Sequence, residues 1–252
     1  MVDSPVGAAS WVRRFHPSSE AEFQLLCFPH SGGSASFFFP FSRDLSPAMD
    51  VWAVQYPGRQ DRRAEPNIPH IHELADHIAE SVGPQLDRPY ALFGHSMGAT
   101  LAYEVALRLQ EAGQEPETLF VSGRPAPHRN VDTGLHRLSD SEIVDDIRAL
   151  DGTGSEVFGD EEVLRIILPA IRSDYHAAET YQYVAGPVLN CPLRAFTGLS
   201  DPRVEVSELH HWSRHTTQSF RLDVFSGGHF YLLENHDAIV KEIQGALLPV
   251  SP

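Results

Sequence analysis

Ser96 lies between Gly94 and Gly98, after the apolar run 90–93 and before a helix predicted over residues 97–112. A serine at the apex of a strand-to-helix turn has strained backbone dihedrals, and the close backbone approach requires glycine on both sides. Its hydroxyl then projects beyond the carboxyl end of the strand, where open α/β sheets bind ligands. The pattern predicts a nucleophilic serine. The alternative is a glycine-rich turn in which the serine is incidental.

A serine hydroxyl attacks poorly unless a base accepts its proton and a third group orients that base. His229 follows Gly227 and Gly228 directly after a predicted strand, 222–225, so its imidazole can reach the same sheet edge as Ser96. We predict His229 as the base. Its rivals lie in a stretch, 208–215, that is typical of a solvated helix: His210, His211 and His215.

The orienting acid is expected on a loop at the carboxyl end of another strand. Asp201 meets this condition, because it follows the predicted strand 193–197 and Gly198. Glu205 is the next candidate, and Asp223 is less suitable because it lies within a strand. The alternative for Asp201 is a turn-initiating Asp-Pro pair.

Two backbone N–H groups are needed to stabilise the oxyanion of an acyl transfer. Met97 supplies one at the start of the helix that follows Ser96, where the helix dipole adds to the effect. The second is expected in the glycine-rich loop after the predicted strand 23–28, at Ser31, with His30 as the alternative.

Strand-like and helix-like segments alternate along the chain, which favours a single α/β domain over residues 1–252 with a mostly parallel central sheet flanked by helices. Residues 11–15 suggest an added antiparallel edge strand. The remaining strands are predicted at 23–28, 51–56, 90–93, 118–122, 193–197 and 222–225, and helices at 72–82, 97–112 and 236–247.

Residues 135–184 interrupt this alternation with three helical patterns, 140–150, 161–170 and 171–183, and no strand between them. We interpret the block as a helical lid over one edge of the sheet. Ordinary crossover helices are the alternative.

The net charge and the apolar content of the chain disfavour several classes of function. The formal net charge of −15 disfavours nucleic acid and anionic membranes as partners. No stretch is long and apolar enough to span a bilayer, and residues 1–5 do not resemble a signal peptide, so a cytoplasmic enzyme is expected.

Cys27 and Cys191 are expected to be buried, reduced thiols. No cofactor or metal is expected, because the histidines at 70, 72 and 77 fit a solvated helix face better than a metal site.

Taken together, six segments resemble the type II thioesterases, the stand-alone editing enzymes of polyketide and nonribosomal peptide synthesis. They appear in the family's order and span most of the chain: 26–35, 55–59 with Arg62, 94–98, 122–127, 198–201 and 227–230. Ser31 is a departure, since the family more often has alanine there. The change should be tolerated, because the donor expected at this position is the backbone N–H and not the side chain.

The resemblance implies hydrolysis of acyl thioesters on the phosphopantetheine arm of an acyl or peptidyl carrier protein. Ser96, His229 and Asp201 would be catalytic, with Met97 and Ser31 holding the oxyanion. His30 and Phe37 are expected at the substrate site, and Phe38 and Phe39 either share that slot or form a core turn. A monomer is expected. A small-molecule carboxylesterase and a non-catalytic binding module on the same fold are the alternatives.

Carrier proteins are usually acidic, as this chain is, so docking calls for a local basic face. The densest basic cluster is the hypothesis for that face: Arg59, Arg62 and Arg63.

Overall fold

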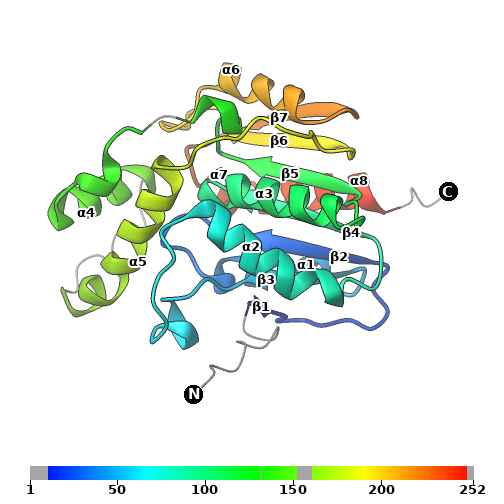
Figure 1. The fold of residues 1–252 in the computed structure, drawn as a ribbon, viewed down its shortest axis with the longest axis horizontal. Helices are drawn as coiled ribbons and strands as arrows, with labels where there is room; N and C mark the ends of the chain where they lie inside the picture. Colours follow the sequence, from blue (N-terminus) through cyan, green and yellow to red (C-terminus); the bar gives the residue numbers. More distant parts are fainter. Residues whose placement is uncertain (1–10, 131, 152–160, 249–252) are drawn as a thin grey trace.

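The computed structural model describes residues 11–130, 132–151 and 161–248, and shows a seven-stranded sheet between two layers of helices (Figure 1). The strand order is β1-β3-β2-β4-β5-β6-β7, and every neighbouring pair is parallel except β1 with β3. The α/β-hydrolase class predicted from the sequence is therefore confirmed. The strands are β1 (Val12–Arg13), β2 (Phe23–Phe28), β3 (Met49–Val54), β4 (Tyr90–His95), β5 (Thr118–Ser122), β6 (Leu193–Gly198) and β7 (Phe220–Phe225).

The central strands are apolar throughout because both faces of the sheet are covered. Successive side chains alternate between the faces. Leu26 and Phe28 pack under α2 (Ile71–Val82) and α3 (Met97–Glu111), whereas Leu25 and Cys27 pack against α1 (Phe39–Leu45) and α8 (His236–Leu247). The helices are α1 (Phe39–Leu45), α2 (Ile71–Val82), α3 (Met97–Glu111), α4 (Asp140–Asp151), α5 (Glu161–Glu179), α6 (Val206–Leu209), α7 (Tyr231–Glu234) and α8 (His236–Leu247).

Most of the predicted strands and helices are present in the structure, and several differ at their boundaries. β3 begins and ends two residues before the predicted 51–56, because Met49 and Asp50 already pair with Phe23 and Gln24 of β2. β7 begins at Phe220 rather than at 222. Helix α3 ends before Gly113, whose φ of 81° suits the left-handed conformation that often closes a helix.

Helices α4 and α5 lie between β5 and β6 in the chain, and Figure 1 shows them beyond the carboxyl ends of the strands, at the left. The predicted division at residue 170 is wrong, because α5 is one helix that contains Pro169. Proline removes one helical hydrogen bond, but Leu168, Ala170 and Ile171 around it are buried. Tertiary packing therefore overrides the local preference. The part of the predicted lid at 152–160 is outside the described residues.

The segment predicted as a solvated helix is α6 followed by a 3-10 helix, η8 (His210–His215), and the prediction is wrong for its inner face. Leu209 and Trp212 are fully buried, and His215 is 1% exposed. Trp212 packs edge-on against Tyr103 of α3 and donates its indole N–H to Arg124 O at 2.8 Å. The segment is thus part of the core.

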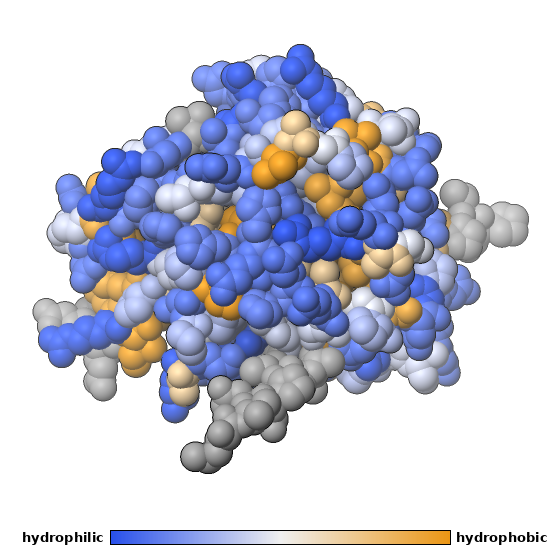
Figure 2. Space-filling view, in the orientation of Figure 1, coloured by the Kyte–Doolittle hydropathy of each residue, from blue (hydrophilic) through white to orange (hydrophobic). Residues whose placement is uncertain are grey.

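Figure 2 shows a mostly hydrophilic face with scattered apolar patches, one of them at the left where α5 lies. Helix α5 carries Ile166, which is 61% exposed. Within the described ranges, no helix combines the length and the apolarity that crossing a bilayer requires. Cys27 and Cys191 are free and buried, as expected. Residues 1–5, which the signal-peptide prediction concerned, are outside the described part.

Candidate active site

Ser96 occupies a strained turn between β4 and α3. Its φ of 55° is positive, which is uncommon for any residue other than glycine, and its N–H donates to Ser122 O at 2.7 Å. A Cβ on Gly94 would lie 2.1 Å from Gly98 O, and a Cβ on Gly98 would lie 2.1 Å from Phe28 O. Both contacts are with backbone, so the turn accepts only glycine on each side of Ser96. Strain of this kind is concentrated at functional sites.

His229 and Asp201 are in contact beside this turn. The Nδ1 atom of His229 lies 2.9 Å from Asp201 Oδ2 and 3.1 Å from Oδ1, and both side chains are almost fully buried. The N–H of Arg203 donates to Oδ1 at 2.8 Å and sets the carboxylate's orientation. A Cβ on Gly198 would lie 2.2 Å from Gly228 O, so the two loops that carry Asp201 and His229 pack directly together.

The rival residues lie elsewhere. Both ring nitrogens of His215 have partners other than Ser96: Nδ1 lies 3.0 Å from Tyr103 OH and Nε2 lies 2.7 Å from His128 Nδ1. Asp223 pairs with Arg194 and Arg221 on the outer strands, and Glu205 is exposed at the start of α6. Among the described residues, Asp201 is the carboxylate that contacts His229.

Two N–H groups in the loop after β2 are already paired. Gly33 N–H donates to His30 O at 2.9 Å, and Gly32 N–H donates to Asp174 at 2.7 Å. The N–H of Ser31 has no hydrogen-bond partner within the described residues, and Ser31 lines the same cavity as Ser96. Met97 is the first residue of α3, so its N–H has no acceptor inside the helix. Two unpaired donors therefore accompany Ser96.

A cavity of about 930 Å³ opens at this point and extends beneath α4 and α5. Phe37 lines the cavity, but Phe38 is buried in the core and Phe39 is 45% exposed, so one of the three phenylalanines is at the site. One wall is polar and includes Arg124, whose pKa is lowered to about 10 by burial. The wall formed by the lid is apolar: Leu135, Ile147, Leu150, Ile167 and Ile171.

His30 lies at the bottom of the site. Its ring packs edge-on against Phe37 and Phe230, at centroid distances of 4.7 and 4.8 Å. Burial, with the neighbouring His229 and Arg59, lowers the pKa of His30 to about 3. His30 is therefore neutral and serves as part of an aromatic floor beneath the cavity.

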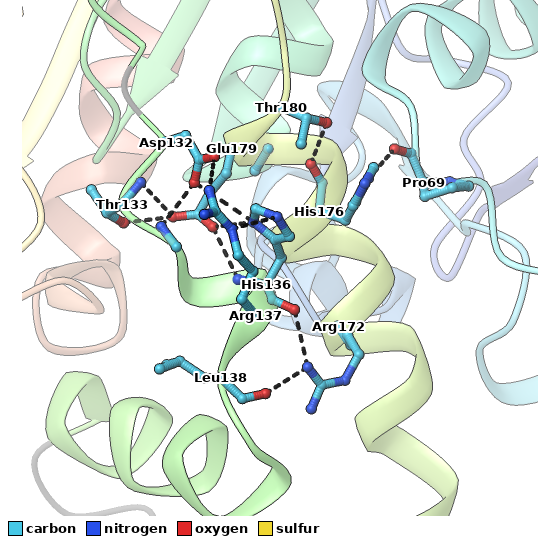
Figure 3. Close-up of polar contacts among 12 residues, drawn as sticks. Pro69, Asp132, Thr133, His136, Arg137, Leu138, Arg172, His176, Glu179 and Thr180 are labelled. Atoms are coloured by element: carbon cyan, nitrogen blue, oxygen red, sulfur yellow. Dashed lines mark hydrogen bonds and ion pairs between the residues drawn. The ribbon is translucent and has the colours of Figure 1, made fainter.

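Asp132, His136 and Glu179 have ligand atoms within 4.8 Å of one another, which resembles a metal site (Figure 3). Their oxygens, however, already accept hydrogen bonds. Glu179 accepts from the hydroxyl of Thr133 at 2.5 Å and from Nδ1 of His136 at 2.7 Å. Burial opposes ionisation of Glu179, but these hydrogen bonds outweigh it and lower its pKa to about 2. The cluster joins the loop before α4 to the end of α5.

The predicted basic docking face does not exist as such. Arg59 is 6% exposed and pairs with Asp174, and Arg62 is 4% exposed, with its guanidinium 4.2 Å from the ring centre of Trp11. Arg62 is the last residue of a short 3-10 helix, Gln60–Arg62, and Arg59 precedes that helix. Arg63 alone of the three is exposed, so the hypothesis is wrong.

Residues 23–247 match the family model described as a thioesterase domain. The chain belongs to the thioesterase family. It is 45% identical to "Thioesterase PikA5" of Streptomyces venezuelae, over 98% of this chain and 90% of that protein. It is 48% identical to a "Probable cadicidin biosynthesis thioesterase" of Streptomyces griseus, over 98% of this chain and 70% of that protein.

Solved structures agree with this membership. The type II thioesterase BorB from the borrelidin biosynthetic cluster superposes with a TM-score of 0.90 at 52% identity, covering 94% of this chain and 98% of its own. RedJ from the prodiginine pathway of Streptomyces coelicolor gives a TM-score of 0.86 at 36% identity, covering 92% and 89%. The predicted family and enzyme class are confirmed: the protein is a type II thioesterase, a hydrolase of the α/β-hydrolase fold.

Proposed function

We propose that this thioesterase hydrolyses acyl groups from the phosphopantetheine arm of carrier proteins and so removes aberrant chains during polyketide or nonribosomal peptide synthesis. The observation that carries the proposal is the combination of Ser96 and His229 on the wall of one cavity, with Asp201 against His229 and apolar lid residues opposite. An apolar lid suits an acyl chain. The borrelidin and prodiginine relatives come from a biosynthetic cluster and a biosynthetic pathway.

In the proposed mechanism, Ser96 Oγ attacks the thioester carbonyl while Nε2 of His229 accepts the hydroxyl proton. Asp201 accepts the Nδ1–H of His229 at 2.9 Å, which leaves Nε2 unprotonated and stabilises the imidazolium that forms. The N–H groups of Met97 and Ser31 bind the oxyanion. The C–S bond then breaks, and the thiolate takes the proton from His229.

A water molecule then hydrolyses the acyl-enzyme. His229 removes a proton from a water molecule that attacks the acyl-Ser96 ester, and the collapse of the second tetrahedral intermediate releases the carboxylic acid and restores the serine hydroxyl. Thiolates leave more readily than amines, so the demand on His229 as an acid is modest. The reaction uses no cofactor.

The proposed partner is an acyl or peptidyl carrier protein, and the proposed setting is the cytoplasm, where the protein acts as a monomer. With a net charge of −15, the chain gains little from long-range attraction to an acidic carrier. Recognition is then expected to depend on the acyl-phosphopantetheine arm.

The proposal is tested with a panel of acyl groups on a phosphopantetheinylated carrier protein, comparing the wild type with Ser96→Ala. Turnover by the wild type, and its loss in the variant, is the expected result. A strong preference for a matched oxygen ester would favour the carboxylesterase. Failure of a fluorophosphonate probe to label Ser96 would favour a binding module.

A further inference from the structure

Asp174 of the lid helix α5 contacts the loop that carries the proposed oxyanion donor. Its carboxylate accepts the N–H of Gly32 at 2.7 Å, and Gly32 directly follows Ser31. Ile171, one turn earlier on α5, packs so closely on the same glycine that a Cβ there would lie 2.6 Å from Ile171 Cγ1. The lid helix thus rests on the oxyanion loop through one charged and one apolar contact.

The carboxylate of Asp174 is buried and needs a counter-charge. Arg59 supplies it: the two side chains form an ion pair and are 1% and 6% exposed. A second guanidinium nitrogen of Arg59 donates to Pro57 O at 2.6 Å, and the guanidinium lies 5.1 Å from the ring centre of Tyr56. A buried carboxylate without this partner would also repel an oxyanion forming nearby.

The residues beside Arg59 hold the same loop at two further points. Tyr56 donates its hydroxyl to Pro29 O at 3.0 Å, and Gln55 accepts the N–H of Ala35 at 2.8 Å. Gln55 also donates to Arg59 O at 3.2 Å. The segment after β3 therefore fixes the loop at its two ends, and Asp174 fixes its tip.

We propose that Asp174, held by Arg59, is a positioning residue that orients the oxyanion turn when the lid helix is docked. The inference rests on the proposed function of Ser31. Residues His30 to Gly33 form a turn closed by Gly33 N–H, and Gly32 has a φ of 75°. Fixing the Gly32 N–H toward Asp174 keeps the Ser31 carbonyl on the opposite side of that peptide. The turn is then held in the conformation in which the Ser31 N–H has no partner and can donate to the oxyanion.

Two double variants separate the hydrogen bond from the ion pair. Arg59→Met with Asp174→Asn removes both charges and keeps an oxygen that can accept the Gly32 N–H. Arg59→Met with Asp174→Leu removes the charges and the acceptor, with a side chain of similar size. Both are assayed on a p-nitrophenyl ester and on an acyl-N-acetylcysteamine thioester, with thermal unfolding as the check on folding.

For the leucine pair we expect kcat to fall about 10- to 100-fold while KM stays within about threefold, because a misplaced oxyanion donor affects the transition state more than the bound substrate. Affinity for a trifluoromethyl ketone, whose hemiketal oxyanion occupies the same position, should fall by the same factor. The asparagine pair should stay within about threefold of the wild type in both measurements. If the leucine pair does not fold, Asp174→Ala replaces Asp174→Leu.

Asp140→Asn is the matched control, because Asp140 ties the other lid helix, α4, to Arg172 of α5 without touching the oxyanion loop or the residues around Asp201. It should change KM more than kcat. Equal losses of kcat in the asparagine and leucine pairs, no loss in either, or the same loss in the control would overturn the proposal.

Neither assay substrate needs a carrier protein. A failure of the wild type on carrier-bound thioesters therefore counts against the proposed function and leaves this test intact.

Discussion

Asp201→Asn tests the proposed arrangement of the triad, because it replaces one carboxylate oxygen with an NH₂ group. The N–H of Arg203 donates to Oδ1 of Asp201, so the asparagine oxygen should take that position and its NH₂ should face His229 at the place of Oδ2. An NH₂ group donates, so Nδ1 of His229 must then accept. The imidazole proton moves to Nε2, and Nε2 can no longer take the proton of Ser96.

The wrong tautomer should lower kcat by about 10³- to 10⁴-fold, the loss found for the same exchange in other serine hydrolases. At 1.36 kcal/mol for each factor of ten, this is about 4 to 5.5 kcal/mol of transition-state stabilisation. KM should change little, because the Asp201 side chain is fully buried behind His229. The assay is thiol release from an acyl-N-acetylcysteamine substrate under single-turnover conditions.

Glu205→Gln is the matched control, since Glu205 is the other acid that the sequence allows and it is exposed. Its kcat should equal that of the wild type within about twofold. A loss of less than tenfold in Asp201→Asn, or a comparable loss in Glu205→Gln, would refute the reasoning.

Three further predictions follow from the packing. Gly98→Ala places a Cβ 2.1 Å from Phe28 O and 2.6 Å from Pro29 O, so we expect about 1–3 kcal/mol of destabilisation and a large loss of kcat, measured by urea unfolding and ester turnover. Ile147→Trp fills part of the cavity of about 930 Å³ and should lower kcat/KM for decanoyl far more than for acetyl thioesters, and equal losses would contradict this role for the lid wall. Burial lowers the pKa of His95 and lowers that of His215 to about 4. Because the unfolded chain then binds more protons than the native one below pH 6.5, the free energy of unfolding should fall by up to about 1.4 kcal/mol per pH unit for each histidine as pH drops toward 4. His215→Gln should flatten the dependence in urea titrations at pH 7 and pH 5, and an unchanged slope would count against it.

Features that depend on neighbours in the chain were predictable. The glycines at 94 and 98, the apolar run before them and the helical pattern after them identify the turn at Ser96, because each property is local. Placing Asp201 and His229 beside it needed one more step, the rule that parallel strands present their carboxyl ends at a common edge. The fold class and the family followed from the same patterns.

Features that depend on distant partners were not predictable. Arg59 and Arg62 were interpreted as a surface cluster, yet they are buried because Asp174 and Trp11, far away in the chain, surround them. The predicted division at residue 170 is absent from α5, and His215 is part of the core through Tyr103 and His128. Neither the charge nor the helix propensity of a local segment shows which distant residues will surround it.

The sequence by itself determined the turn at Ser96, the order of the proposed catalytic residues and the family, since these follow from residue types at fixed local spacing. Only the tertiary structure decided which N–H groups of the loop after β2 are paired. That choice depends on Gly32 donating to Asp174, a residue on a lid helix whose contact with the loop exists only after the chain has folded. Burial and pairing are properties of the folded whole, and local sequence patterns do not encode them.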